Sequence, residues 1–428
     1  MKDCILITAY AVNPNRGSED GTGWNIIRHL GKEHHLIAIT RRNNQADIDA
    51  FWEEHGEEKE ESNIDFHYYD LPQWLSFWKR GSRGALLYHY LWQLGVALFV
   101  IRKDLKFDIA HHLNFHCDWC PSFLWLCGRP VVWGPIGHHP RIPKDYLQHS
   151  FWRTRVAEQL KWRLKTLAWR LDPFLQLSKN RSAAIIGINS TVAKALRLPS
   201  ERVDIIPAVA APKRTVGTPS VPQQFRVLSV GRFVPLKGFD MCINAFARFY
   251  KQLAPADQQQ VKLTLIGKGP ELPKLEKLIA QTELPTHSIE ILPWVPQAEL
   301  WQHFAQSQLF FFPSHEGAGM VIPEAMSFSL PILCYDNCGP GETTGPKAGI
   351  RVPYSTYEQS VEDYAQVLSS LYHHPALRKQ MAQAALDRFD QVLNWPAKAK
   401  QISKIYERVS VKQSLPQSAI SMMASKLS

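Results

Sequence analysis

Short apolar runs rich in Val and Ile recur along the chain, and segments of helical length separate most of them. In the first half the runs read ILITAYAV, HLIAIT, IDFHYYDL, FDIAHHL, PVVWGP, AAIIGIN and VDIIPA. Strands buried on both faces of a parallel sheet show such nearly continuous apolar runs, and each parallel crossover needs a dozen or more residues. The pattern therefore predicts a parallel sheet built from βαβ units.

A second series of the same kind follows residues 207–224, a proline-rich stretch without a hydrophobic period that is typical of a linker. The second series reads FRVLSVGR, VKLTLIGKG, IEILPWV, LFFFPS, PILCYD and IRVPY. We predict an α/β protein with two Rossmann-like domains whose parallel sheets face each other across a cleft. The expected parts are an N-terminal domain at 1–206, the linker, a second domain at 225–390, a C-terminal helix at 391–410 and a flexible tail at 411–428.

The composition indicates the cellular compartment and the class of partner. Of the 428 residues, 45% are apolar and 21% are charged, which is the balance of a soluble globular protein. The net charge of +10 favours an acidic partner, such as a nucleotide or a membrane face. Seven cysteines and the absence of a secretory pattern at the N-terminus indicate a reducing compartment. We therefore expect a cytoplasmic protein.

Two segments raise the question of membrane contact. Residues 84–101 carry no full charge, but a strand signal follows soon after, so a buried helix packed on a sheet explains them better than a membrane span. Residues 151–180 interleave tryptophans with a basic excess, as does an amphipathic segment on the anionic inner face of the cytoplasmic membrane. An ordinary helix with a solvated basic face is the alternative. The basic residues are Arg153, Arg155, Lys161, Arg163, Lys165, Arg170 and Lys179.

Two cations follow the first strand of the second series. That strand ends at Gly231, and Arg232 and Lys237 come before the next helix. Arg can hold phosphate oxygens with its planar fork, and Lys can neutralise them as a point charge, so the pair suits a diphosphate. Two surface cations in a loop would give the same pattern. Gly267, after the following strand, would let the backbone approach the same ligand closely.

A pair of glutamates lies in FFFPSHEGAGMVIPEAMSFSLPILCYD, which runs from strand to loop to helix to strand. Glu316 precedes the loop, and Glu324 lies at the helix start, where the helix dipole also favours an acid. Carboxylates on either side of a phosphate-binding loop suit a nucleotide sugar, because its sugar and ribose hydroxyls need acceptors. Gly317 and Gly319 allow the loop to turn tightly, and we expect the free backbone N–H groups of Met320 and Val321 to face the anion. All four are therefore predicted donor-binding residues.

The same motifs carry a family resemblance. EGAGMVIPE, GRFVPLKGFD and IGKGPELPKLEKL, with WVPQAELWQHFAQSQLFFFPS between them, resemble the donor half of family 4 glycosyltransferases of the GT-B fold over about residues 226–400. The resemblance implies that Arg232 and Lys237 hold the diphosphate. It also implies that Glu316 contacts the transferred sugar and that Glu324 binds the ribose. The implied reaction is a retaining transfer of a hexose from a nucleoside diphosphate sugar, without an essential metal or other cofactor.

The first half carries two further segments of resemblance. NPNRGSEDGTGWNI resembles the glycine-rich loop after the first strand in an exopolysaccharide-type branch of the family, and VVWGPIG resembles that branch's second signature. The branch implies polysaccharide biosynthesis with a glycan or lipid-linked acceptor. Ala318 replaces a common Phe, and His138 and His139 follow GPIG where the branch usually has glycine. The glycines of the expected N-terminal loop are Gly17, Gly21 and Gly23.

Histidines end the strand in FDIAHHLNFHCDWCPSF, and members of the family usually place a sugar-contacting His just after this strand. We rank His112 first and His111 second for that contact, because the two cannot point to the same face of a strand. His116, Cys117 and Cys120 also suggest a metal, but a Cys-x2-Cys motif with one adjacent His and no second pair is a weak zinc signal. We therefore predict no metal site.

Two other functions fit the same residues. A nucleotide-sugar epimerase of this fold would keep the diphosphate site but need no acceptor. A non-catalytic partner protein of the GT-B fold would keep the architecture without the chemistry, and the intact cations and glutamates argue against it. The basic excess clusters beside tryptophans and not in a nucleic-acid motif, so we expect no nucleic acid among the partners.

Overall fold

The computed structural model describes residues 3–81, 83–113, 117–147, 152–213 and 224–414. The chain divides into two compact units, and each contains one parallel sheet. The α/β class and the two parallel sheets predicted from the sequence are confirmed. Unit 1 comprises Met1–His138, Leu160–Ala208 and Trp395–Ser428, and unit 2 comprises His139–Gln159 and Val209–Asn394.

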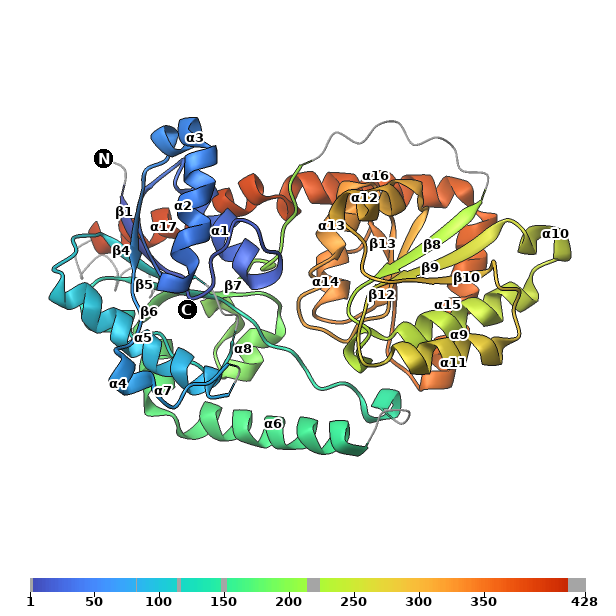
Figure 1. The fold of residues 1–428 in the computed structure, drawn as a ribbon, viewed down its shortest axis with the longest axis horizontal. Helices are drawn as coiled ribbons and strands as arrows, with labels where there is room; N and C mark the ends of the chain where they lie inside the picture. The colour runs from blue at the N-terminus through green and yellow to red at the C-terminus, as the bar shows by residue number, and fades with distance from the viewer. Residues whose placement is uncertain (1–2, 82, 114–116, 148–151, 214–223, 415–428) are drawn as a thin grey trace, which may run out of the picture. The chain divides into compact units, whose positions relative to one another are not determined.

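Unit 1 has a seven-stranded sheet in the order β3-β2-β1-β4-β5-β6-β7 (Figure 1). The strand order reverses between β1 and β4, which is the topological switch point where ligands of such sheets bind. The strands are β1 (Cys4–Thr8), β2 (His35–Thr40), β3 (Ile64–Tyr68), β4 (Ile109–His112), β5 (Val131–Ile136), β6 (Ser182–Gly187) and β7 (Val203–Ile205).

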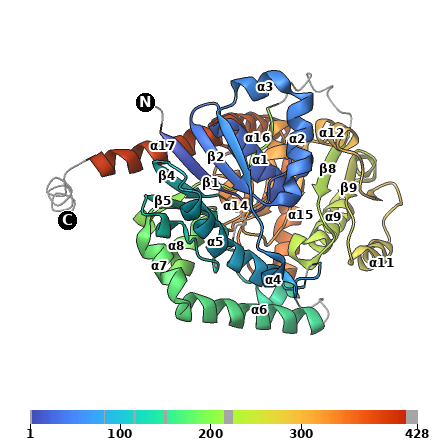
Figure 2. The same cartoon turned by 60° about the vertical axis from the view of Figure 1, so that its left-hand side comes forward.

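Helices cover both faces of the unit 1 sheet (Figure 2). The core on one face joins α5 and α7 to the sheet and contains Trp92, Leu175 and Leu6. The other face carries α1 and α17, and Tyr406 of α17 reaches the sheet. The helices are α1 (Ser18–Leu30), α2 (Gln45–Glu54), α3 (Gly56–Glu61), α4 (Gln73–Ser76), α5 (Ala85–Arg102), α7 (Pro173–Arg181), α8 (Thr191–Leu196) and α17 (Trp395–Ser414). Helix α6 (Trp152–Leu171) belongs to unit 1 from Leu160 onward.

Unit 2 has a six-stranded sheet in the order β10-β9-β8-β11-β12-β13, so its switch point lies between β8 and β11. Both faces are apolar because β11 alternates its aromatic residues: Phe311 packs into one core and Phe310 and Phe312 into the other. The strands are β8 (Phe225–Val230), β9 (Val261–Ile266), β10 (Ile289–Leu292), β11 (Leu309–Phe312), β12 (Ile332–Tyr335) and β13 (Gly349–Val352).

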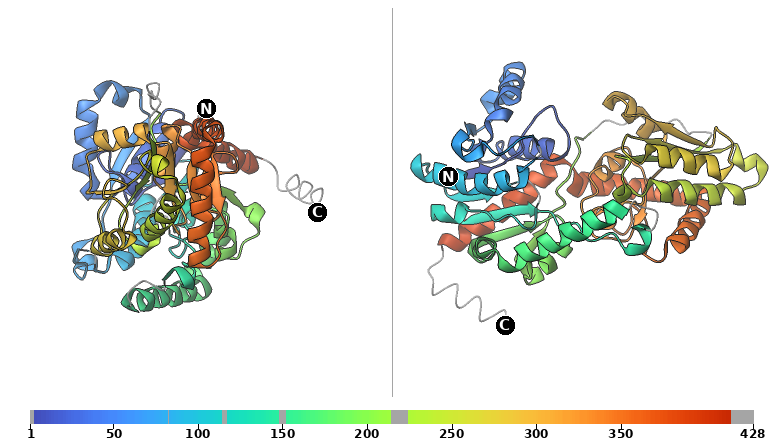
Figure 3. Two further views of the ribbon diagram at one scale, coloured as in Figure 1. Left: turned by 90° about the vertical axis from the view of Figure 1, so that its right-hand side faces the viewer. Right: turned by 60° about the horizontal axis from the view of Figure 1, so that its bottom comes forward.

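The unit 2 sheet lies between two helical layers (Figure 1 and Figure 3). One layer packs through Phe246 and Tyr364, and the other through Phe304 and Met326. The first layer contains α9 (Phe239–Gln252), α11 (Leu272–Thr282) and α15 (Tyr357–His373), and the second contains α12 (Gln297–Gln306), α13 (Ile322–Ser327) and α16 (Pro375–Arg388). The short helices α10 (Pro255–Gln258) and α14 (Pro340–Thr344) lie in the connections.

The division between the units differs from the expected boundaries at residues 139–159, and it assigns the C-terminal helix, which was expected as a separate part, to unit 1. The segment at 139–159 belongs to unit 2, because Tyr146 packs against Tyr335 and its hydroxyl bonds Ser360 at 2.6 Å. The C-terminal helix belongs to unit 1, and Ser403 on it bonds His34 at 2.8 Å. The middle of the predicted linker, at 214–223, and most of the predicted tail lie outside the described residues.

The apolar helix α5 contributes to the core of unit 1, as the sequence predicted for residues 84–101. In the described part of the chain, only α5 is long and apolar enough to cross a membrane, by length and composition alone. Its Tyr88, Trp92, Val96 and Val100 are buried against the sheet.

Two tryptophans of helix α6, Trp162 and Trp169, point into unit 1. Trp162 and Trp169 lie against the ring of His138, at centroid distances of 5.8 and 5.6 Å, and the indole N–H of Trp169 donates to the carbonyl of Asp118 at 2.9 Å. A half-buried indole needs a partner for its N–H, and this one finds it inside the unit. The outward face of α6 instead presents leucines, which are 55–69% exposed: Leu160, Leu164, Leu167 and Leu171.

Some basic residues of the same segment point into unit 1 and others are exposed to solvent. Lys165 pairs with the buried Asp118 at 3.0 Å, and Lys179 donates to the carbonyl of Leu196 at 2.9 Å, so both point into the unit. Arg163 and Arg170 are exposed. The side chains of Trp152, Arg153, Arg155 and Lys161 lie outside the described residues.

Candidate active site

The loops after β8 and β11 form the candidate site of unit 2. They leave neighbouring strands at the switch point of the sheet, and they carry Arg232, Lys237 and Glu316. The backbone N–H of His315 donates to the carbonyl of Leu236 at 2.9 Å, and the Ser314 hydroxyl donates to the same carbonyl at 3.1 Å. The two loops are therefore fixed to each other before any ligand binds.

Two glycines let neighbouring loops at this edge of the unit 2 sheet lie close to each other. Gly238 has φ +68°, and a Cβ there would lie 2.3 Å from the carbonyl oxygen of Pro313. Gly267 follows β9 with φ +159°, and a Cβ there would lie 1.9 Å from the carbonyl oxygen of Gly231. A side chain at either position would force the loops apart. The sequence analysis predicted that Gly267 lets the backbone approach a ligand. In the structure, the close neighbour of Gly267 is instead the backbone of the loop after β8.

Lys237 and Glu316 form a shielded ion pair. Lys237 Nζ lies 2.5 Å from Glu316 Oε2, and the two side chains are only 15% and 7% exposed. The backbone N–H of Met320 donates to Glu316 Oε1 at 3.3 Å, and Lys237 Nζ also lies 4.8 Å from the ring centroid of Phe312. Because the pair is largely removed from water, its electrostatic interaction is stronger than that of a surface pair. Arg232, in contrast, is exposed and free to turn toward a ligand without breaking a bond described in this loop.

The loop between the glutamates differs in one detail from the sequence prediction. Met320 and Val321 were both expected to offer backbone N–H groups to an anion, but the N–H of Met320 donates to Glu316. Gly319 turns the loop with φ +70°, and α13 begins at Ile322. Glu324 lies in the first turn of this short helix and is partly exposed.

Two histidines next to the pair were not among the predicted site residues. His315 is buried against the stacked rings of Tyr335 and Tyr354, and its Nδ1 bonds the Tyr354 hydroxyl at 2.9 Å. Burial lowers the pKa of His315 to about 3, so it is a neutral support and not a cation. His139 accepts the backbone N–H of Gly317 through Nδ1 at 3.0 Å. The only sequence signal for His139 was its departure from the glycine of the related branch.

In unit 1 the two candidate histidines at the end of β4 face opposite sides of the sheet. His111 is fully buried, with Nδ1 2.5 Å from the Tyr406 hydroxyl and Nε2 2.7 Å from the carbonyl oxygen of Gly134. Burial lowers the pKa of His111 to about 3. His111 thus uses both ring nitrogens to join α17 and β5 to the strand. His112, the first-ranked candidate, lines a small cavity on the other face.

The expected N-terminal glycine loop is mostly helical, which corrects the sequence assignment. Only Gly17 precedes α1, and Gly21 and Gly23 lie inside that helix. A Cβ at residue 21 would lie 2.3 Å from the carbonyl oxygen of Arg16, so glycine there lets the preceding segment fold back onto the helix. The glycine spacing reflects this packing and not an extended loop.

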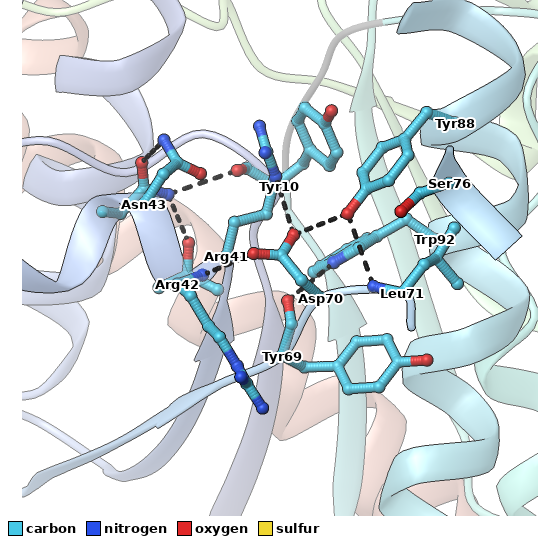
Figure 4. Close-up of polar contacts among 12 residues, drawn as sticks. Tyr10, Arg41, Arg42, Asn43, Tyr69, Asp70, Leu71, Ser76, Tyr88 and Trp92 are labelled. Atoms are coloured by element: carbon cyan, nitrogen blue, oxygen red, sulfur yellow. Dashed lines mark hydrogen bonds and ion pairs between the residues drawn. The ribbon is translucent and has the colours of Figure 1, made fainter. Parts of the chain in front are cut away.

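A polar cluster at the carboxyl ends of β2 and β3 had no sequence signal. Figure 4 shows Arg41, Asp70 and Tyr88 pointing toward one another, with Arg41 Nε 3.1 Å and the Tyr88 hydroxyl 2.7 Å from Asp70 Oδ1. The Arg41 guanidinium also lies 4.8 Å from the ring centroid of Tyr10. The cluster fixes a cation at the edge of unit 1 where a ligand of such a sheet binds.

The sequence of unit 2 matches a known family. Residues 216–388 match the family model described as glycosyl transferases group 1. Unit 2 carries a glycosyl transferase group 1 domain. The match contains Arg232, Lys237, Glu316 and Glu324, so all four predicted donor-site side chains lie in the group 1 domain.

Known relatives extend the likeness beyond the group 1 domain. The chain is 27% identical over 329 residues to the D-inositol 3-phosphate glycosyltransferase of Kineococcus radiotolerans, covering 70% of this chain and 73% of that protein. It is 32% identical over 165 residues to the amylovoran biosynthesis glycosyltransferase AmsD of Erwinia amylovora, covering 38% of this chain and 43% of that protein. The likeness to AmsD therefore spans less than half of either chain.

A solved structure establishes the fold. Anabaena Alr3699/HepE in complex with UDP superimposes with a TM-score of 0.60 at 16% identity, over 95% of this chain and 100% of that chain. The fold is GT-B, as predicted.

Proposed function

We propose that this protein is a retaining glycosyltransferase that moves a hexose from a nucleoside diphosphate sugar to a glycan or lipid-linked acceptor in polysaccharide biosynthesis. The observation that carries the proposal is the Lys237–Glu316 pair at the switch point of the group 1 domain. It puts a cation for the diphosphate and a carboxylate for the sugar within 2.5 Å of each other. The solved neighbour in complex with UDP supports a nucleotide ligand for this fold.

In the proposed reaction the bond between the anomeric carbon and the diphosphate oxygen breaks, and the acceptor oxygen bonds that carbon. The acceptor's proton passes to the departing diphosphate. Lys237 and Arg232 stabilise the negative charge that develops on the diphosphate, so the transfer needs no metal. Glu316 positions the sugar and holds the Lys237 ammonium in place, and Glu324 accepts hydrogen bonds from the ribose hydroxyls.

Glu316 is a positioning carboxylate in this scheme and not a nucleophile. Its two oxygens already meet Lys237 and the N–H of Met320. A carboxylate held by a cation is a weak nucleophile, because its charge is stabilised where it stands. We assign the sugar contact in unit 1 to His112 and a supporting role to His111.

A thermal-shift panel with UDP, GDP and ADP sugars tests the donor class. A donor at 100 times its dissociation constant should add roughly 2.7 kcal/mol to the free energy of unfolding. Product analysis with the stabilising donor alone then separates the rival functions. A transferase gives only slow hydrolysis, an epimerase converts the sugar, and a non-catalytic partner protein leaves the donor unchanged even when candidate acceptors are added. Either of the last two outcomes would contradict transfer.

We further propose that unit 1 attaches peripherally to an anionic membrane surface. The exposed leucines Leu160, Leu164, Leu167 and Leu171 follow one face of α6, beside the exposed Arg163 and Arg170. A second stretch of the same unit exposes Trp74 and Phe77, at 71% and 77%, before Lys79 and Arg80. No acidic residue lies between Asp70 and Asp104. Apolar side chains next to cations without acids suit the headgroup region of an anionic leaflet.

The double substitution Leu164→Asp/Leu167→Asp should release the protein from anionic vesicles. Each leucine that leaves the headgroup region costs roughly 1 kcal/mol, so the double substitution should lower the bound fraction at least about tenfold in a sedimentation assay. Val411→Asp is the matched control, because Val411 is 57% exposed on α17 of the same unit but lies outside the leucine face. Wild-type protein that stays in the supernatant at low salt would exclude the membrane role.

A further inference from the structure

Three side chains that can bind a metal ion converge in unit 1, and none of them is assigned to the transfer reaction. His89 on α5 meets Cys117 and Cys120, which follow β4, and one ligand atom from each residue lies within 4.8 Å of the other two. In a tetrahedral zinc site, bonds of about 2.3 Å to sulfur and 2.0–2.1 Å to nitrogen place neighbouring ligand atoms roughly 3.5–3.8 Å apart. Small rotations of the side chains would therefore bring the three groups around one ion.

The cluster is buried but can be reached from solvent. His89 and Cys120 are 0% and 1% exposed, and Cys117 is partly exposed. Gln93 contacts His89 Nε2 at 3.0 Å, and the Tyr10 ring packs edge-on against the imidazole at 4.9 Å. These neighbours hold the ring in one orientation, as groups around metal-binding histidines do.

A cavity of about 10 Å³ borders both thiols. His112 and the Gly134-Pro135 segment complete its wall. That volume is close to what a single water molecule occupies. The fourth coordination position of an ion held by the three side chains could thus be filled from this cavity.

Charge balance selects the class of ion. Two thiolates and a neutral imidazole carry a charge of −2, so a divalent cation makes the buried site neutral, which avoids the cost of an isolated buried charge. Sulfur ligands select Zn²⁺ and similar thiophilic ions over Mg²⁺ or Ca²⁺.

We propose that unit 1 binds one Zn²⁺ ion through a ring nitrogen of His89 and the sulfurs of Cys117 and Cys120, with water from the adjoining cavity as the fourth ligand. Binding converts two thiols to thiolates and releases two protons. The site replaces the metal set considered from the sequence, because the imidazole comes from α5, while His116 lies outside the described residues.

The proposed ion has a structural role. It joins α5 to the segment after β4, and that segment begins next to His112. The same imidazole packs against the Tyr10 ring, and the Arg41 guanidinium lies over that ring. The ion therefore braces the edge of unit 1 on which both His112 and the Arg41 cluster lie. It takes no part in the transfer step, and the proposal does not depend on the proposed function.

Metal analysis of the full chain tests the site. Purified wild-type protein supplied with Zn²⁺ and dialysed against a weak chelator should retain one equivalent per chain. Co²⁺ in place of Zn²⁺ should produce a thiolate-to-cobalt charge-transfer band and the strong visible bands of a tetrahedral site. Cys117→Ser should weaken Zn²⁺ binding about 10²-fold or more, because loss of a direct ligand exceeds the effect of an outer-shell change.

Cys127→Ser is the matched control, since Cys127 is a half-buried thiol of the same unit outside the cluster and the substitution should leave Zn²⁺ binding unchanged. His89→Gln should also remove the tetrahedral Co²⁺ spectrum. Because the wild-type measurements need no variant to fold, they decide the question alone. Wild-type protein that retains no Zn²⁺ and gives no thiolate band overturns the proposal, and so does a Cys117–Cys120 disulfide that forms in a protein unable to bind either ion.

Discussion

Removal of either diphosphate cation should lower turnover by about 10²-fold or more. Arg232→Ala and Lys237→Ala each remove a positive charge that meets the leaving diphosphate, and a preorganised charge of this kind contributes several kcal/mol to the transition state. The measurement is steady-state transfer with the donor identified by the thermal-shift panel. Addition of EDTA should not abolish wild-type transfer, because the transfer step uses no metal and the proposed zinc ion only braces unit 1.

The two variants should differ in stability. Lys237→Ala leaves Glu316, which is only 7% exposed, without its cation, and an unpaired buried charge is strongly destabilising. Arg232→Ala leaves no such charge, because Arg232 is exposed. The double variant Lys237→Ala/Glu316→Gln should recover the melting temperature but not the turnover, which separates folding from chemistry.

A third cation provides the control for charge itself. Lys262 lies near the start of β9 and pairs with Glu290 at 2.9 Å, away from the carboxyl end of the strand. Lys262→Ala should therefore leave transfer unchanged. Activity that EDTA abolishes and Mg²⁺ or Mn²⁺ restores would contradict transfer without a metal.

Conversion of each glutamate to glutamine should separate sugar positioning from nucleotide binding. Glu316→Gln should lower turnover by about 10²-fold, because the sugar loses its carboxylate. The affinity for the free diphosphate should stay nearly the same, since Lys237 is released and the amide oxygen can still accept the N–H of Met320. Glu324→Gln should instead weaken the binding of the nucleoside diphosphate.

Calorimetric titration of both variants with nucleoside diphosphate, together with transfer rates, measures the two effects. Glu299→Gln is a suitable control, because Glu299 also lies in the first turn of a helix in unit 2, on α12, but outside the loops at the switch point. Equal losses of diphosphate affinity in the Glu316 and Glu324 variants would refute the separate roles.

Some expectations succeeded because they depended on short stretches of chain. Phe310, Phe311 and Phe312 predict a strand buried on both faces, and β11 is such a strand. Arg232 and Lys237 follow a strand whose end is marked by Gly231, so their place at the sheet edge follows from local sequence. The direction of side chains on a half-buried helix is less local, and only the structure showed that Trp162 and Trp169 of α6 lie against His138.

The sequence by itself determined the two parallel sheets, the loops that carry the cations and glutamates, and the resemblance that names their chemistry, because apolar periodicity and strand-end motifs act over a few residues. Only the tertiary structure joined Lys237 to Glu316 across 79 positions, His139 to Gly317 across 178, and His89 to the two cysteines. Such pairs depend on strand order, since neighbouring strands of a parallel sheet can be far apart in the chain while their ends lie side by side.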